Sequence, residues 1–406
     1  MNLLIIGTGA AGLFAAVTAA RNNLSVTVLD KNRTPGKKLR ITGKGRCNVT
    51  NNCTKEEFFD SITNNAKFLF SAYSNFTAQD TMRFFEDLGV PLKTERGNRV
   101  FPESDSAHDI ADALVNECKR LGVTFREFNV KKILHDNGRV TGVTDGNNEI
   151  YAENIILATG GKSYPGTGSD GSGYKLAADL GVNITDIRPS LVPLVVREKF
   201  VKDLQGLSLR NVKLSITENN KVVFSEQGEM LFTDYGITGP LVLSASAHIK
   251  NPLGAIAGID LKLALDELTL DRRILRDFDE NPNRHFGNAL DKLLPSSLRP
   301  IIVNLSGINP EKQVNAVTKA ERSALVKLLK NFSLEITGFR PILEAIITRG
   351  GVNIKEIEPK TMRHKKIPNL YFAGEVIDLD AYTGGYNLQI AFTTAFAAAK
   401  AATDSY

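Results

Sequence analysis

The chain lacks tryptophan and has only three cysteines, Cys47, Cys53 and Cys118, in 406 residues. None of these cysteines forms a CxxC pair, so the pattern argues against a structural zinc site and favours a reducing compartment. We expect no metal site. The sequence also lacks an apolar run of 18 or more residues, which argues against a membrane-spanning helix, and it lacks the basic start of a signal peptide. These absences predict a cytoplasmic protein without a membrane partner.

A strong charge of either sign is also missing. The formal net charge is +5 and the isoelectric point is about 8.9. This balance permits an anionic cofactor or a nucleic acid as a partner but requires neither. Hydrophobic residues make up 42% of the chain, an ordinary proportion for a globular protein. A chain of this length can bury a large core without disulfide bonds.

The first 30 residues have the pattern of a dinucleotide-binding unit. We expect a strand, a glycine turn, an Ala-rich helix, a second strand and an acid, in the order Asn2–Ile6, Gly7-Thr8-Gly9-Ala10-Ala11-Gly12, Leu13 to about Asn22, Ser25–Leu29 and Asp30. In such a unit Gly7 makes the tight turn, Gly9 lets the backbone approach a pyrophosphate, and Gly12 lets the helix pack on the strand. The helix N-terminus attracts phosphates, and Asp30 can accept hydrogen bonds from a ribose diol. This unit alone leaves NAD and FAD open.

A basic, glycine-rich stretch follows the second strand, where a plain NAD domain would soon begin a helix. It reads TPGKKLRITGKGRCNVTNN from Thr34 to Asn52. Such a loop can cross a flavin and its diphosphate and offer backbone N–H groups and positive charge; the alternative is a solvated basic loop. Five residues separate Cys47 from Cys53, so we favour a buried structural Cys47 over a redox dithiol.

The middle of this region returns the chain to the same site. A meander is expected over Arg126–Leu134, Arg139–Thr144 and Glu149–Ala152, followed by a buried strand, Ile155–Leu157, that ends in Ala158-Thr159-Gly160-Gly161. A second GxGxxG, Gly166–Gly171, follows Ser163-Tyr164-Pro165. These three residues are not expected to form a strand, because Pro165 would interrupt one. We therefore expect no second nucleotide domain and no resident NADPH site, while transient NAD(P)H binding stays open.

A second glycine-to-helix entry lies near the C-terminus. The run Asn369–Glu375 reads as a buried strand that ends in Gly-Glu, and Asp378, Asp380 and the turn Gly384-Gly385 precede an Ala-rich helix. A helix N-terminus can stabilise negative charge on a reduced flavin ring, and Glu375 can bond a ribityl hydroxyl. Alone, this segment is equally consistent with an ordinary βα turn. Paired with the N-terminal unit it favours FAD, an extended ligand that needs contacts from both chain ends.

Several motifs occur in order across nearly the whole chain: GTGAAGLFAA, GKKLRITGKGRCNVTN, ILATGGKSYPGTGSDGSGY, MLFTDYGITGP, ITRGGV and FAGEVIDLDAYTGGYNLQIAF. With them the sequence resembles the bacterial flavoproteins of the YhiN/BaiN type, which include aminoacetone oxidase. The resemblance implies an α/β fold with an FAD-binding Rossmann-like domain, an inserted β-barrel-like domain and a small helical domain. It also implies non-covalently held FAD. Family members are linked to amine oxidation, bile-acid ring reduction and dihydrouridine formation in ribosomal RNA.

Motifs and resemblance together predict the domain boundaries and the cofactor residues. The FAD-binding domain is expected at 1–190 and 349–406, the β-rich domain at 191–265 and 333–348, and the helical domain at 266–332. The predicted cofactor-binding residues are Gly7, Gly9, Ala10, Ala11, Gly12, Asp30, Lys31, Lys38, Leu39, Gly43, Gly45, Arg46, Cys47, Asn48, Val130, Thr159, Gly160, Gly161, Gly374, Glu375, Asp378, Gly385, Tyr386, Asn387 and Leu388.

The sequence pattern of the inserted region, residues 191–348, predicts strands followed by helices and a return to strands. Strands are expected at Leu191–Arg197, Leu207–Thr217, Lys221–Phe224, Ala257–Leu265 and within Leu334–Ile347, and helical spacing marks DRRILRDFDE, FGNALDKLL and AERSALVKLLKN. We expect the inserted domains to cap the flavin and form a substrate cleft. Asp234 and Tyr235, in a glycine-flanked loop, are the catalytic candidates. Many members of the resembled family carry His where this chain has Asp234, which puts an imidazole-dependent chemistry in doubt.

Three functions are consistent with these features. The first is FAD-dependent hydride transfer between the flavin and a small-molecule substrate, as amine oxidation or NAD(P)H-linked reduction. The second is flavin-dependent reduction of uridine to dihydrouridine in ribosomal RNA, for which the basic run Arg363–Lys366 could serve the RNA backbone. The third, a non-catalytic flavin sensor, is disfavoured because a sensor needs no capping domains.

Overall fold

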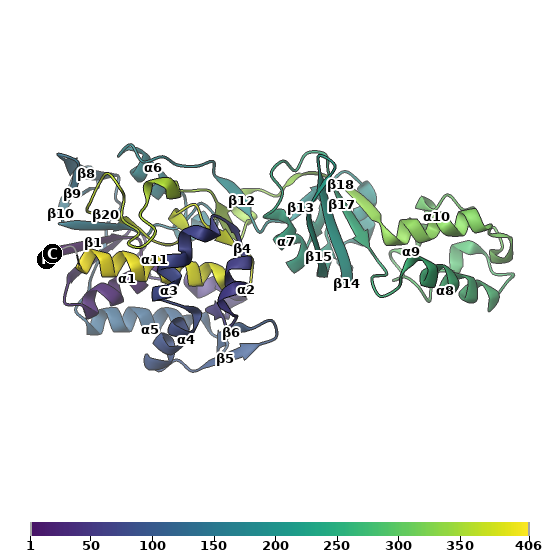
Figure 1. Cartoon of the computed structure of the whole chain (residues 1–406), viewed down its shortest axis with the longest axis horizontal. Coiled ribbons are helices and arrows are strands. Elements are labelled where there is room, and N and C mark those ends of the chain that lie inside the picture. The colour runs from purple at the N-terminus through teal and green to yellow at the C-terminus, as the bar shows by residue number, and fades with distance from the viewer. Residues whose placement is uncertain (1, 405–406) are drawn as a thin grey trace. The chain divides into compact units, whose positions relative to one another are not determined.

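The computed structural model describes residues 2–404, and the chain divides into two compact units (Figure 1). Unit 1 takes the residues up to Ser190 and those from Pro341 onward, and unit 2 is Leu191–Arg340. Among residues 2–404, no helix combines the length and the apolar character that a membrane span requires.

A parallel sheet forms the centre of unit 1. Within the described residues its strand order is β20-β11-β1-β2-β7, with bounds Leu370–Phe372, Asn154–Leu157, Asn2–Ile6, Ser25–Asp30 and Thr124–Glu127. The short apolar runs of β1 and β11 suit strands that are covered on both faces. Numbered along the chain, this order is 3-2-1-4-5 read from β7, the Rossmann arrangement, whose ligand crevice lies at the carboxyl ends of the strands where the order reverses. Here that point is between β1 and β11.

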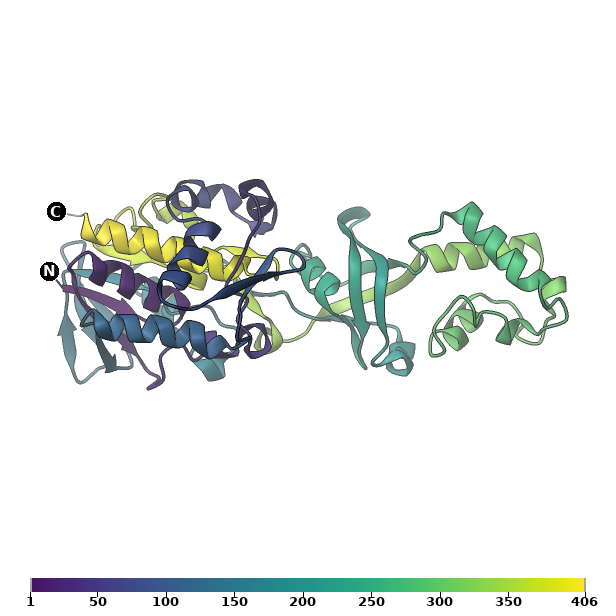
Figure 2. The same ribbon diagram turned by 90° about the horizontal axis from the view of Figure 1, so that it is seen from below.

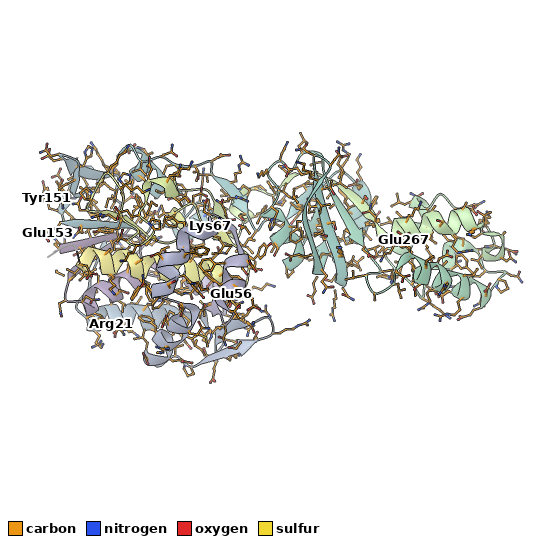
Figure 3. All side chains as sticks on the ribbon, in the orientation of Figure 1. Arg21, Glu56, Lys67, Tyr151, Glu153 and Glu267 are labelled. Carbon is orange, nitrogen blue, oxygen red and sulfur yellow. The ribbon has the colours of Figure 1, made fainter. Side chains whose placement is uncertain are left out.

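Helices from both ends of the chain lie side by side against this sheet. Helix α1 (Ala10–Arg21) lies between α5 (Ala107–Arg120) and the C-terminal α11 (Tyr386–Thr403) (Figures 1 and 2). The small Ala side chains of α1 and α11 permit this close packing, and Phe14 fills the interface with its ring 5.1 Å from that of Phe392. Arg21, labelled in Figure 3, ties α1 to α5 through a 2.8 Å ion pair with Glu117. The N-terminal glycine turn and the C-terminal helix therefore belong to one packed layer.

Smaller elements complete unit 1. Its other helices are α2 (Lys55–Asp60), α3 (Phe70–Asn75), α4 (Ala78–Asp87) and α6 (Ser172–Ala178). Its small sheets are β3-β6-β5 (Thr50–Asn51, Arg99–Pro102, Leu92–Glu95), β10-β9-β8 (Glu149–Tyr151, Arg139–Thr144, Lys132–Asp136), β21-β4 (Asp380–Ala381, Ile62–Asn64) and β12-β19 (Arg188–Ser190, Ile347–Arg349).

The predicted meander is present, but one predicted strand is wrong. Arg126–Leu134 is two strands, because β7 ends at Glu127 in the parallel sheet and β8 begins at Lys132 in the antiparallel one. The alternating side chains of this run are compatible with a strand throughout, and alternation does not reveal that a chain changes its pairing partner. The connecting residues Phe128, Asn129 and Val130 line a pocket instead.

Unit 2 contains a closed barrel and a group of helices, most of which lie between the last two barrel strands in the chain. The barrel order within the described residues is β13-β16-β15-β14-β17-β18, with bounds Leu194–Val196, Gly236–Thr238, Lys221–Phe232, Ser208–Glu218, Ala255–Asp260 and Phe332–Phe339. Its helices are α7 (Pro240–Ser246), α8 (Glu267–Asp279), α9 (Arg299–Leu305) and α10 (Lys319–Lys330). Barrel and helices share one apolar core, in which Leu270, Leu329 and Phe332 are fully buried.

Two expectations for unit 2 are corrected. The strand predicted to end at Phe224 continues to Phe232, because the polar residues after Phe224 still pair with β14 although they hide the alternation. FGNALDKLL forms only a short turn of 3-10 helix at Phe286–Asn288. Its backbone N–H groups at Phe286 and Gly287 donate to the carbonyls of Lys312 and Pro310, so contacts with a distant loop hold this segment in a conformation that the spacing of apolar residues does not reveal.

Candidate dinucleotide site

The three glycines of the first turn have different surroundings. Gly7 has φ +110°, and a Cβ there would lie 2.4 Å from the carbonyl oxygen of Ala158, just after the neighbouring strand β11. A Cβ on Gly12 would lie 1.9 Å from the carbonyl oxygen of Gly7. Gly9 has ordinary backbone angles, and a Cβ there would meet no atom within 4 Å. Gly7 and Gly12 are therefore required by packing, whereas Gly9 borders open space at the N-terminus of α1.

Asp30 lies at the end of β2 beside this turn, and protein donors surround its carboxylate. Oδ2 accepts hydrogen bonds from the backbone N–H of Thr8 at 2.8 Å and from its hydroxyl at 2.6 Å. Oδ1 accepts from the backbone N–H and side-chain amide of Asn32 at 2.8 and 3.0 Å. The carboxylate thus braces the glycine turn, and a ribose diol would have to share or replace these donors. Sequence reasoning missed Thr8 and Asn32, although Thr8 lies inside the motif.

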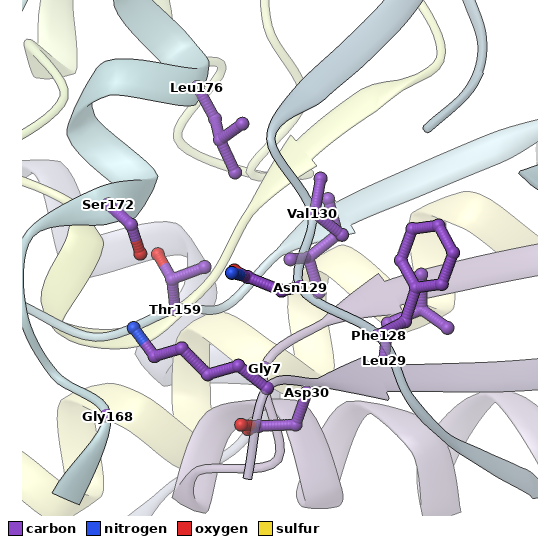
Figure 4. A pocket seen from close by; sticks show the side chains of 12 residues that line it. Gly7, Leu29, Asp30, Phe128, Asn129, Val130, Thr159, Gly168, Ser172 and Leu176 are labelled. Carbon is purple, nitrogen blue, oxygen red and sulfur yellow. The ribbon is translucent and has the colours of Figure 1, made fainter. Parts of the chain in front are cut away.

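A pocket opens at the carboxyl ends of β1 and β2 (Figure 4). It is lined by Ile6, Gly7, Leu29, Asp30, Lys31, Phe128, Asn129, Val130, Thr159, Gly168, Ser172 and Leu176. Gly7, Asp30, Lys31, Val130 and Thr159 of the predicted cofactor set therefore meet here. Gly168 and Ser172 were not predicted, because the second glycine motif was set aside when it failed to follow a strand.

The basic side chains after β2 are largely paired with protein carboxylates. Arg40 bonds Asp112 at 2.7 Å, and Lys31 bonds Asp170 at 2.6 Å. Arg46 bonds Glu95 and Asp105, which hold the pKa of its guanidinium above the usual value, and its Cζ lies 4.2 Å from the Phe101 ring centroid. The loop therefore owes its shape to these pairs, and less of its positive charge faces a ligand than the sequence suggests. Gly43, with φ +57°, and Gly45, with φ +85°, make its left-handed turn.

Lys38 belongs to a buried network around Glu375. Its Nζ donates to Glu375 Oε2 at 2.8 Å and to the hydroxyl of Ser163 at 2.9 Å. Glu375 Oε1 accepts from the backbone N–H of Thr348 at 2.9 Å and from Ser163 at 3.1 Å. Burial alone would raise the pKa of Glu375, but the charge and hydrogen bond of Lys38 and the other donors outweigh it and lower the pKa. The Glu375 carboxylate is therefore ionised at neutral pH, and four separate chain segments meet at it.

Helix α11 begins against the glycine-rich loop of the N-terminal region. A Cβ on Gly385 would lie 2.3 Å from the carbonyl oxygen of Thr50, so the contact requires glycine there. Thr50 donates its hydroxyl to Gln389 Oε1 at 2.6 Å, and Asn51 Nδ2 donates to the carbonyl of Gly384 at 2.9 Å. The first turn of α11 carries no acidic residue, so its N-terminal dipole is free to attract negative charge.

The segment between β20 and α11 is held from both sides. The Asn387 side chain bonds the backbone of Ala381: its Oδ1 accepts from the Ala381 N–H at 2.9 Å, and its Nδ2 donates to the Ala381 carbonyl at 2.8 Å. Asp378 accepts from the Asn64 amide at 2.8 Å. Asp380 is fully buried and accepts from Ser190. Burial raises the pKa of Asp380 even though nearby donors and Arg349 oppose this shift.

Buried polar atoms without partners test whether these residues fit an extended ligand. In the part of the chain that the structure describes, the side-chain oxygens of Asn48, Asn51, Thr159 and Ser169 are buried without a hydrogen-bond partner. Such atoms are costly unless another molecule satisfies them. Asn48, Asn51 and Thr159 belong to the same segments as predicted cofactor residues, Ser169 lies beside the pocket-lining Gly168, and Gly9 leaves the space that a pyrophosphate needs. The residues present therefore fit FAD.

Two of the predicted cofactor residues, Cys47 and Leu39, are buried inside the protein, and the two catalytic candidates, Asp234 and Tyr235, lie in unit 2. Cys47 is fully buried, with burial raising the pKa of its thiol to about 12, and all three cysteines are free. Leu39 is buried in the core of unit 1. Asp234 and Tyr235 belong to unit 2, in the turn between β15 and β16, where Asp234 is exposed and Arg340 lies 4.3 Å from the Tyr235 ring centroid.

Comparisons with known proteins give a consistent family. Residues 1–401 match the family described as HI0933-like protein Rossmann domain. The chain is 33% identical over 402 residues to the ribosomal RNA dihydrouridine synthase of Escherichia coli (strain K12), covering 98% of this chain and 96% of that protein. It is 30% identical over 408 residues to the 3-dehydro-bile acid delta(4,6)-reductase of Clostridium scindens, covering 98% of each. Among solved structures, the 3-ketosteroid delta1-dehydrogenase of Sterolibacterium denitrificans has a similar fold, with a TM-score of 0.53, 11% identity and coverage of 100% of this chain and 99% of that one.

Proposed function

The chain belongs to the HI0933-like protein Rossmann domain family and is an oxidoreductase of the flavoprotein class, and from this premise we propose that it uses FAD to reduce uridine to dihydrouridine in ribosomal RNA. The observation that carries this proposal is the 33% identity, over 98% of the chain, to a ribosomal RNA dihydrouridine synthase. The reduction saturates a ring double bond that is conjugated to a carbonyl group. This is chemistry that a reduced flavin performs by hydride transfer.

The residues of unit 1 suit the binding of FAD along the carboxyl edge of the sheet. The N–H groups at the start of α1, beside Gly9, would receive the pyrophosphate. The pocket with Asp30 and Val130 would receive the adenosine end. The N-terminus of α11, beside Gly385, would stabilise negative charge on the pyrimidine part of the ring. Lys38 and Glu375 would hold the four segments that enclose the middle of the ligand.

The test begins with ribosomal RNA from a strain in which the gene for this chain is deleted. We expect dihydrouridine, mapped by mass spectrometry of RNA fragments, to be missing at one or more positions and to return with the wild-type gene. A Gly9→Val gene should fail to restore it, because the side chain would fill the space beside the pyrophosphate. A Gly181→Ala gene should restore it, since Gly181 has open space around it and lies outside the pocket lining. An unchanged dihydrouridine content after deletion would refute the proposal.

A second candidate is reduction of a small conjugated enone, and the 30% identical bile-acid reductase supports it. Both candidates share the flavin and the type of double bond. They separate when reduced, purified protein is mixed without oxygen with ribosomal RNA from the deletion strain or with an unsaturated 3-oxo steroid. The true substrate restores the visible absorbance of oxidised flavin. Amine oxidation is less favoured, because these two relatives are named for dihydrouridine synthesis and for reduction.

A further inference from the structure

The second glycine-rich segment, Gly166–Gly171, has a place in the fold that its motif does not explain. It follows no strand: Pro165–Thr167 is a short 3-10 turn, and α6 begins at Ser172. Gly168 and Ser172 nevertheless line the pocket at the carboxyl ends of β1 and β2, together with Asp30 and Val130 (Figure 4). The segment is therefore part of the wall of the first nucleotide pocket.

Contacts with the residues just after β2 hold the segment in place. Lys31 Nζ lies 2.6 Å from Asp170 Oδ2, and Asn32 Nδ2 donates to the Thr167 carbonyl at 3.2 Å. At Gly168, with φ +104°, a Cβ would come within 2.3 Å of Asn32 Nδ2. The Asn32 side-chain amide also donates a hydrogen bond to Asp30, the residue expected beside the ribose, so Asn32 connects the segment to Asp30.

The other side of the segment faces Gly160 and Gly161, which follow β11. The Gly171 N–H donates to the Gly161 carbonyl at 3.0 Å. Ser169 is buried at 5% exposure, its hydroxyl has no partner among the described residues, and a Cβ on Gly160 would lie 3.0 Å from that oxygen. Thr159, which lines the pocket, also has a buried hydroxyl without a partner among the described residues. Unpartnered buried hydroxyls in and beside a pocket wall point to a ligand that supplies the missing hydrogen bonds.

We propose that residues 164–171 form a further part of the cofactor site, covering the adenosine half of FAD and fastened by the Lys31–Asp170 ion pair. The assignment to the adenosine half follows from position. The pocket adjoins Asp30 at the end of β2, whereas the ring end is expected at α11. FAD leaves this site only after the segment opens, so the ion pair controls how long the cofactor stays bound. This inference rests on the FAD binding of the proposed function.

The first test removes the negative charge of Asp170 and with it the ion pair with Lys31. Asp170→Asn is compared with Asp179→Asn, which breaks a matched 2.7 Å pair with Lys175 on α6, outside the pocket lining. For a partly exposed pair we expect FAD to dissociate about three to five times faster from Asp170→Asn, and ADP to bind more weakly by a similar factor. Asp179→Asn should match the wild type. A charge-reversed pair, Lys31→Asp with Asp170→Lys, should recover part of the loss.

Gly168→Ala provides a test that does not depend on charge. Its Cβ displaces Asn32, so FAD dissociation should be about tenfold faster or more. Gly181→Ala carries a similar left-handed strain at φ +80° in open space and serves as the control. Unchanged FAD dissociation in both Asp170→Asn and Gly168→Ala, or weakened FAD with unchanged ADP, would overturn the proposal. A wild-type protein that binds no FAD would instead refute the proposed function.

Discussion

The replacement of Gly9 by alanine separates cofactor binding from folding. Gly9 has φ −74° and ψ −173°, which alanine adopts readily, and no atom lies within 4 Å of the new Cβ. Gly9 is also the N-cap of α1, where alanine costs about 0.5 to 1 kcal/mol relative to better caps. Replacing glycine by alanine also reduces the conformational entropy of the unfolded chain, which stabilises the folded protein by about 0.4 to 1 kcal/mol. We therefore expect the free energy of unfolding of the apoprotein to change by less than about 0.5 kcal/mol.

The same methyl group should weaken FAD binding strongly. A pyrophosphate that contacts the backbone N–H groups at this turn must approach closely, and a carbon there needs roughly 3.5 to 4 Å from its neighbours. Overpacking of this kind costs about 1 to 3 kcal/mol, which corresponds to a 5- to 150-fold larger Kd for FAD. The measurements are urea unfolding of the apoprotein and titration with FAD followed by flavin fluorescence.

Gly12→Ala is the contrasting variant. Its Cβ would stand 1.9 Å from the Gly7 carbonyl oxygen, a clash with backbone that no side-chain movement relieves. We expect this variant to lose several kcal/mol of stability or to fail to fold, because α1 must move away from β1. If Gly9→Ala bound FAD as tightly as the wild type, the pyrophosphate would not lie at this turn, and the assignment of the site would be wrong.

Three further predictions concern stability and reactivity. Hydrogen bonds from Arg120, together with Arg21, lower the pKa of Glu117 to about 2. The contribution of the Glu117 carboxylate to stability is therefore complete above about pH 4.5 and is lost as the pH falls towards 2. In urea unfolding, Glu117→Gln should lower the free energy of unfolding by about 1 to 2 kcal/mol at pH 7, after allowance for solvent screening, and should leave it unchanged near pH 2. Asn369, buried at 2% exposure, bonds the N–H and carbonyl of Val140, so Asn369→Ala should lower the free energy of unfolding by about 3 kcal/mol, and a loss below about 1 kcal/mol would contradict this. Burial raises the pKa of the Cys47 thiol to about 12, so the native protein should resist a thiol reagent at pH 8 until urea unfolds it, and rapid labelling of Cys47 would argue against its burial.

Local sequence patterns predicted the local backbone structure well where one residue type has one physical reason to be present. Gly7 and Gly12 are needed for close backbone contacts, and both contacts are present. The apolar run before Gly7 predicted β1, and the Ala-rich run after Gly12 predicted α1. Patterns failed where the chain passes from one sheet to another, as at Phe128, or where contacts with a distant loop hold a segment that was expected to be helical, as at Phe286. Periodicity reports which side chains are buried, and it does not report which strand or loop they pair with.

The sequence by itself determined the glycine turn, the strand that ends at Asp30 and the second helix entry at Gly385, because each depends on neighbouring residues. Only the tertiary structure decided that Lys38 meets Glu375, that Arg46 turns to Glu95, and that the second glycine segment forms the wall of the first pocket. These contacts join residues that are 49 to 337 positions apart. They depend on how sheets and helices stack, and spacing along the chain carries no information about that stacking.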